Sequence, residues 1–166
     1  MEKKIHDLRE REKELQCIYR VHEALKDEEA PLREVLKKAV DHIPDGWQYP
    51  GLCMVKLELE GYYITTNHFF ETNIFQSADI IVDENIVGRI FVYYSRKPSQ
   101  KQSEPSFLPE EKRLLNNIAW QIAQAVFSKR LKRTIDYMTS DAQDQSSQLG
   151  LLRPDSDQHW HWRLQM

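Results

Sequence analysis

Glycine and cysteine are scarce in this sequence, and their scarcity argues against several kinds of functional site. The five glycines among 166 residues are not clustered, so a glycine-rich loop that cradles phosphates is not expected. The two cysteines, Cys17 and Cys53, lack the spacing of a metal knuckle or a redox pair. A local Ser-His-Asp signature is also missing. We therefore expect no metal and no cofactor, and we expect that the chain is not an enzyme.

Long hydrophobic runs and an excess of positive charge are missing as well. No apolar run approaches the roughly 20 residues that are needed to span a bilayer. The formal net charge of −3 gives no reason to expect nucleic acid, whose binding needs concentrated Lys and Arg. Residues 129–133 form one basic stretch, which is either a solvated helix face or a surface for anions or membranes. The composition predicts a cytoplasmic protein without nucleic-acid or membrane partners.

Two helices are predicted before the first strand. The first covers about residues 3–26, where apolar side chains recur at steps of three and four. Its first half is nearly all charged, so a monomer core cannot bury it. This half either pairs with another helix along a narrow seam or is a solvated helix supported by ion pairs. The second helix covers about residues 31–43, with Pro31 in its first turn.

The apolar period changes to two from Leu52 onward, which predicts strands. We expect strands at about residues 52–59, 62–67, 77–82 and 86–94, with a hairpin across residues 83–85. A loop that contains Phe69, Phe70 and Phe75 follows the second strand. The pattern predicts an antiparallel sheet of four strands, or of five if a further short strand pairs with them.

The last predicted helix covers residues 109–138, with Pro109 and two carboxylates in its first turn. At about 1.5 Å per residue it is roughly 45 Å long, whereas strands of this size span only about 20 Å. Its second half is therefore expected to project from the domain. Residues 139–154 are rich in Ser, Asp and Gln and are predicted to form a linker.

Trp160 and Trp162 lie close to the end of the chain, where this sequence supplies little for them to pack against. They indicate that residues 155–166 are the truncated start of a following module. His159 and His161 flank Trp160 and could supply two metal ligands, but a third ligand is missing nearby, so metal binding is not expected.

Aromatic side chains gather around the first two predicted strands and the loop after them. They either form core and lid packing or line an apolar pocket for a small ligand, which polar groups would orient. The candidate pocket residues are Trp47, Tyr49, Tyr63, Thr65, Phe69, Phe70 and Phe75.

The order of the predicted elements and four short strings resemble a GAF domain. The strings are LQCIYRV at 15–21, HIPDGWQYP at 42–50, QSADI at 76–80 and FLPEE at 107–111. They are similar to a compact GAF-like subfamily that precedes PAS and histidine-kinase modules and begins phosphoenolpyruvate synthase-like proteins. The segment 155–163 resembles the one that follows the domain in the latter group. The resemblance implies an α+β fold, with a GAF/PAS-like antiparallel sheet flanked by N-terminal helices and a long C-terminal helix.

We divide the chain into a projecting helix at 1–14 and a GAF-like domain at 15–138. The resemblance implies a regulatory function, in which a homodimer modulates an attached C-terminal catalytic module and an unidentified small molecule acts as its ligand. A ligand-free dimerisation or interaction module is the alternative, because the signature of cyclic-nucleotide-binding relatives is missing. The predicted dimer residues on the terminal helices are Leu8, Leu15, Ile18, Ile122, Val126 and Leu131.

Overall fold

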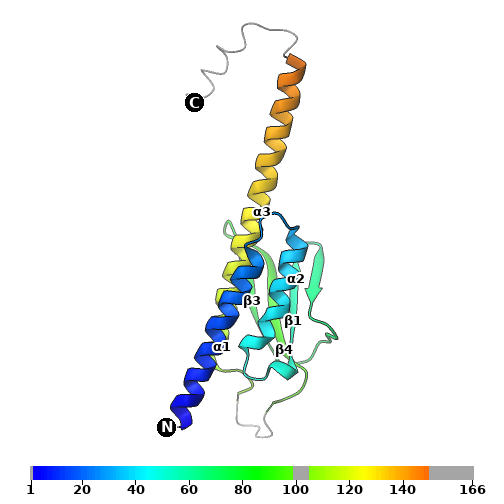
Figure 1. Ribbon diagram of the computed structural model, residues 1–166. Helices are drawn as coiled ribbons and strands as arrows, with labels where there is room; N and C mark the ends of the chain where they lie inside the picture. The colour runs from blue at the N-terminus through cyan, green and yellow to red at the C-terminus, as the bar shows by residue number, and fades with distance from the viewer. Residues whose placement is uncertain (1, 99–104, 150–166) are drawn as a thin grey trace. The chain divides into compact units, whose positions relative to one another are not determined.

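The structure is a computed structural model, which describes residues 2–98 and 105–149. Within these residues the fold is α+β, as predicted, with three α-helices and a four-stranded antiparallel sheet (Figure 1). Contacts divide the chain into two units, Met1–Lys129 and Arg130–Met166. The sheet and the helices that cover it belong to the first unit.

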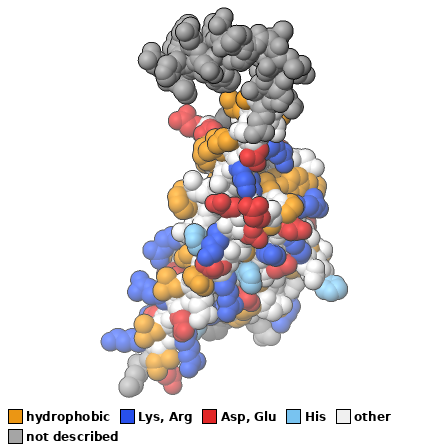
Figure 2. Space-filling view, turned by 45° about the horizontal axis from the view of Figure 1, so that its top comes forward, with side chains coloured by type: hydrophobic (Ala, Val, Ile, Leu, Met, Phe, Trp, Pro, Cys, Tyr) orange, Lys and Arg blue, Asp and Glu red, His pale blue; other side chains and the backbone are white. Residues whose placement is uncertain are grey.

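Helix α1 runs from Glu2 to Leu25 and buries only one narrow face. Its buried residues are Cys17, Val21 and Leu25, at the four-residue steps that place side chains on one side of a helix. Charged side chains cover most of the rest, with hydrophobic ones between them, along the lower left of Figure 2 where the chain begins. The packing of this one face holds the second half of α1 against the core.

Helix α2 covers Leu32–His42 and is apolar along the side that it buries. Pro31 is the N-cap just before this helix, rather than a residue of the first turn as predicted. Two short 3-10 helices, η1 (Ile43–Gly46) and η2 (Pro50–Leu52), then lead into the sheet. The buried residues of α2 are Val35, Leu36, Ala39 and Val40.

The strands of the sheet are β1 (Cys53–Leu59), β2 (Tyr62–Thr65), β3 (Phe75–Val82) and β4 (Asn85–Tyr94), in the spatial order β2-β1-β4-β3. The predicted hairpin is confirmed, since β3 and β4 pair on either side of Asp83 and Glu84. These two residues have φ angles of 50° and 66°, the positive values that a tight hairpin turn requires. Phe75 lies in β3 and pairs with Tyr93, so its predicted position in a loop is wrong.

The sheet has an inner and an outer face, because successive side chains of a strand point to opposite sides. Inner side chains share one hydrophobic core with the helices, and Figure 1 shows α1 and α2 on this side of the sheet. The inner residues that are almost fully buried include Val55, Leu57, Ile80, Ile90 and Val92. The strand register places Lys56, Tyr63, Phe75, Phe91 and Tyr93 on the outer face.

Helix α3 runs from Pro109 to Leu149, with its residues from Arg130 onward in the second unit. The prediction that the helix ends at Met138 and that a linker comes next is wrong for Thr139–Leu149, which are helical. Ser and Asp are only moderate helix formers, but Gln favours helices, and no Pro or Gly interrupts this segment before Gly150. The rest of the predicted linker and the predicted module at 155–166, with His159 and His161, lie outside the described residues.

The start of α3 is fixed by Glu111, whose side chain is 1% exposed. One carboxylate oxygen accepts the N–H of Leu108 at 2.7 Å and the other accepts the N–H of Gln48 at 2.7 Å. The first bond is half of a capping box, which satisfies an N–H that the helix itself leaves unpaired. The second bond joins the helix to the segment after η1. Burial raises the pKa of Glu111, and these two N–H groups partly oppose that rise.

We expect Glu111→Gln to destabilise the protein by about 2 kcal/mol at pH 5, because an amide keeps only one of the two acceptor oxygens. The pKa of Glu111 is higher in the folded chain than in the unfolded chain, where it is near 4.5. Such a carboxyl stabilises the folded state less as the pH rises above 4.5. Gln at position 111 does not titrate, so the difference in unfolding free energy between the variant and the unaltered chain should shrink from pH 5 to pH 8. Urea unfolding at both pH values measures this, and a deficit that grows with pH would contradict it.

Candidate functional site

The seven predicted pocket residues do not line one pocket, because the sheet separates them. Trp47 is fully buried in the core, where its indole N–H donates to Oε1 of Gln76 at 3.3 Å. Tyr49 contacts the inner residue Tyr94, with ring centroids 5.9 Å apart. Both belong to the inner side of the sheet, and their assignment to a pocket with the outer residues is therefore corrected. Proximity in the sequence had grouped residues that fold onto opposite sides.

The other five predicted residues lie on the outer face of the sheet or on the loop that follows β2. Tyr63 and Thr65 are outer residues of β2, and the Phe70 side chain is 52% exposed. Phe69 and Phe75 join a group of rings that we call the outer aromatic cluster, namely Phe69, Phe75, Phe91 and Tyr93. The centroid of Tyr93 lies 5.3 Å from Phe69, 5.3 Å from Phe75 and 5.9 Å from Phe91. These separations are those of favourable ring pairs.

Lys56 projects from the middle of β1 into this aromatic surface and is only 9% exposed. Its Nζ lies 4.7 Å from the Phe91 centroid and 5.9 Å from those of Tyr63 and Tyr93, within the range of cation–π attraction. Carboxylate oxygens of Glu71 and Glu58 lie 2.5 Å and 3.1 Å from the same atom. Burial alone would lower the pKa of Lys56, but hydrogen bonds with Glu71 and Glu58 outweigh it and raise the pKa.

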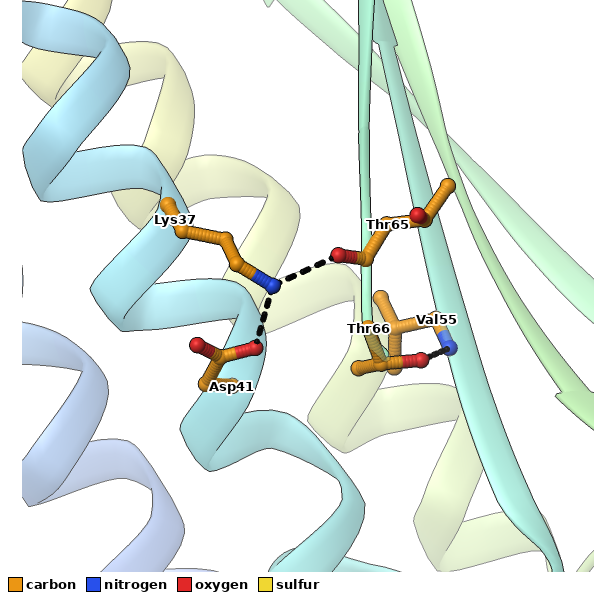
Figure 3. A network of polar contacts seen from close by, with 5 residues as sticks. All are labelled: Lys37, Asp41, Val55, Thr65 and Thr66. Carbon is orange, nitrogen blue, oxygen red and sulfur yellow. Dashed lines mark hydrogen bonds and ion pairs between the residues drawn. The ribbon is translucent and has the colours of Figure 1, made fainter. Parts of the chain in front are cut away.

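Polar contacts anchor the start of the loop at residues 66–74, which carries Phe69 and Glu71. Thr66 continues the pairing of β2 with β1, since its Oγ1 accepts the N–H of Val55 at 3.1 Å (Figure 3). One residue earlier, the carbonyl of Thr65 accepts a 2.8 Å bond from Nζ of Lys37, which also pairs with Asp41 of α2 (Figure 3).

The far end of the same loop is anchored by Thr72. Its hydroxyl donates to the carbonyl of Tyr94 at 2.8 Å and accepts the N–H of Ile74 at 3.2 Å. The loop therefore leaves and rejoins the sheet at defined points, between which Phe69 and Glu71 lie over the outer face.

A second candidate site is the exposed apolar stripe of α1, which we define as Ile5, Leu8, Leu15 and Tyr19. These side chains are 48%, 66%, 61% and 63% exposed, although they are among the largest apolar residues of the helix. Their spacing of three, seven and four residues keeps them on one side of the helix, away from the buried face. This side is open to solvent, and the side chains that border Leu8, Leu15 and Tyr19 along it include Arg11, Glu12, Gln16 and Arg20.

The predicted dimer residues divide between exposed and buried positions. Leu8, Leu15 and Leu131 are exposed, with Leu131 at 48% in the second unit. Ile122 and Val126 are completely buried in the core of the chain itself, so their assignment to a dimer contact is wrong, and Ile18 packs partly buried against that core. The large apolar residues that α3 exposes in the first unit are instead Trp120 and Phe127, which sequence reasoning missed.

Lys129, the last residue of the first unit, joins α3 to the connection between α1 and α2. Its Nζ donates to three backbone carbonyls, those of Asp27 at 2.7 Å, Glu28 at 2.8 Å and Ala30 at 2.6 Å. Oδ1 of Asp27 accepts the N–H groups of Glu29 and Ala30, which shapes this connection so that its carbonyls converge. An ammonium with three donors fits such a set of acceptors. The contact holds α3 where α1 ends.

Both cysteines are buried, and neither has the surroundings of a reactive thiol. Burial raises the pKa of Cys17 to about 12, and burial also raises the pKa of Cys53. The Cys17 thiol lies 3.7 Å from the carbonyl of Ile43, a weak contact of its S–H group. A nucleophilic cysteine needs the opposite shift.

No protein-family model matches this chain, and no curated protein matches it significantly. Among the described residues, no group of three His, Cys, Asp or Glu side chains is placed to hold a metal ion. The described helices likewise include none with the length and apolar character needed to cross a membrane. The outer aromatic cluster with Lys56 and the exposed stripe of α1 are the features from which a function can be argued.

We expect Lys129→Met to loosen the connection between α1 and α2 while leaving the sheet unchanged. Methionine keeps an unbranched side chain but removes the charge and all three donors. A loss of about 2 kcal/mol of local stability corresponds to amide exchange of Glu29 and Ala30 that is roughly 30-fold faster. Hydrogen–deuterium exchange measures this, with the exposed Lys38→Met on α2 as the control. Equal exchange in both variants would show that the three carbonyls need no cation.

Proposed function

We propose that this chain is a regulatory module that forms a homodimer through α1, binds a small molecule and modulates an attached catalytic module. The observation that carries the proposal is the exposed apolar stripe of α1, with Leu8 and Leu15 more than half exposed. The GAF resemblance supplies the regulatory interpretation, and the comparisons with known proteins add nothing to it.

The physical argument for a second copy is the pattern of exposure on α1. Single exposed apolar residues are ordinary on protein surfaces, but a series on one side of a helix at steps of three, seven and four is what a paired helix buries. The surface beside Leu8 and Leu15 is open and is bordered by other side chains of α1, so another helix can pack against it. A second copy presents the same stripe, so two copies are complementary about a twofold axis.

The cost of leaving this stripe in water supports the same proposal. Full burial of a leucine side chain is worth roughly 1.5–3 kcal/mol, and each dimer would bury such residues from both copies. The first part of α1, which has few apolar residues on its other sides, would also gain tertiary contacts beyond those that it has near the start of α3.

Helix α3 is the route by which this module would act on an attached catalytic module. Its beginning is held by Glu111, and Lys129 ties it to the end of α1. The helix is continuous to Leu149. Within the second unit it exposes further apolar residues, Leu131, Ile135 and Met138. A change in how two α1 helices pair would therefore alter the position of α3, because α1 and α3 share one core and are linked through Lys129.

A ligand-free dimerisation module is the second candidate. The separation of Trp47 and Tyr49 from the outer residues favours this candidate, because the predicted pocket loses two of its lining residues. The two candidates share the dimer and differ in whether a small molecule binds on the outer face of the sheet.

We expect the double variant Leu8→Asp, Leu15→Asp to be monomeric where the unaltered chain is dimeric. Four buried leucines per dimer would be replaced by carboxylates, so the dissociation constant should rise at least about 100-fold. Sedimentation equilibrium measures this, and far-UV circular dichroism checks that the fold is retained.

Ile81→Asp is the matched control, because Ile81 is 54% exposed on β3 and lies outside the stripe. The control should dimerise normally. A chain that is monomeric without substitution, or a double variant that dimerises as tightly as the control, would overturn the proposal.

A further inference from the structure

Lys56 is an unusual residue for its position, because it is a cation in the central part of a sheet and is nine-tenths buried. A buried ammonium is costly unless anions and hydrogen bonds replace its water. Two carboxylates do this here, and they are held in different ways. Glu58 lies two residues along the same strand, on the same face, and its position is fixed by the sheet.

Glu71 is held much less firmly than Glu58. It comes from the loop at residues 66–74, and its side chain is 64% exposed although its carboxylate lies 2.5 Å from Nζ of Lys56. Ion pairs in which one partner is largely solvated contribute little net free energy. Glu71 could therefore turn into water at small cost, and Lys56 would keep Glu58 as its partner at 3.1 Å.

The surface next to this ion pair is formed by aromatic rings. Phe91 and Tyr93 flank the ammonium, and Phe75 continues the rings outward with 48% of its surface exposed. Tyr63, on the other side, is 64% exposed. A ring or short hydrocarbon chain placed here would cover exposed aromatic surface, which an aspartate or glutamate side chain cannot do.

We propose that Lys56 is the binding site for a small carboxylic acid with an aromatic or hydrocarbon body, and that Glu71 occupies the carboxylate position when no ligand is bound. The external carboxylate replaces that of Glu71 on Nζ of Lys56, and its apolar body lies on the outer aromatic cluster. The exchange conserves charge at Lys56, since one carboxylate leaves as the other arrives. This inference deepens the proposed function by naming the class of ligand, but binding at Lys56 does not require the dimer.

An anion fits this place better than a cation does. The position between the rings is already filled by the ammonium of Lys56, whose backbone is fixed by pairing with both neighbouring strands. A cationic ligand would have to expel this side chain, whereas an anionic ligand replaces only a solvated loop carboxylate.

The test uses benzoate as the probe and Glu71→Gln as the decisive variant. Benzoate should shift the amide resonances of Lys56, Glu71, Phe91 and Tyr93 in the unaltered chain, in a saturable way. Glu71→Gln removes the internal competitor, so benzoate should bind about fivefold more tightly, the effect of removing one exposed ion pair. Glu34→Gln on the exposed start of α2 makes the same change in net charge and should leave the affinity unchanged.

Two further probes separate carboxylate recognition from simple hydrophobic contact. Neutral benzamide and cationic benzylammonium have the same ring and should bind at least tenfold more weakly than benzoate. Lys56→Met should abolish the benzoate shifts, and Glu71→Gln keeps the test decisive if Lys56→Met fails to fold.

Equal or weaker benzoate binding in Glu71→Gln than in the Glu34→Gln control would overturn the proposal, as would preference for benzylammonium. Sedimentation of the unaltered chain with and without benzoate then addresses the regulatory role separately. Saturable binding without any change in dimerisation would support the carboxylate site and would count against ligand control of the dimer.

Discussion

The single hydrophobic core between the helices and the inner face of the sheet is the constraint on which the rest of this structure depends. Inner residues such as Leu57 and Ile90 are covered by helices, while the outer face carries Lys56 among aromatic rings. The helices must turn one face to this single core, which leaves apolar residues exposed on their opposite faces within the described part of the chain. The exposed stripe of α1 and the outer aromatic cluster are thus both consequences of a fold with only two layers.

Two polar contacts convert this layered packing into a defined arrangement of helices. Glu111 binds the N–H groups of Leu108 and Gln48, and Lys129 binds carbonyls of the connection after α1. They act at opposite ends of the packed part of α3, and in both a charged side chain binds backbone groups of another segment or of the helix start. The apolar core supplies most of the stabilisation, whereas these contacts determine where α3 begins relative to its neighbours and where it meets α1.

The elements were largely predictable from the sequence, and the site was not. Period-two alternation and the turn before Asn85 identify strands locally, because the backbone dictates which side chains share a face. The same periodicity cannot say whether an apolar helix face meets its own core, as Ile122 does, or remains exposed, as Leu15 does. Lys56 meets Phe91 and Glu71 only through strand register and a loop, which are long-range properties. Helix α3 extends beyond its predicted end, because a polar segment that contains neither Gly nor Pro does not reliably end a helix.

The burial of Cys17 and Cys53 has a practical consequence for studying this molecule. They are the only cysteines in the chain, and with both thiols buried and protonated at neutral pH, maleimide and methanethiosulfonate reagents should find little to attack in the native state. A single cysteine introduced at an exposed position would then carry a spin label or dye against a silent background. Distances between labels on two copies, and their change with solution conditions, become measurable without first removing any native residue from the core.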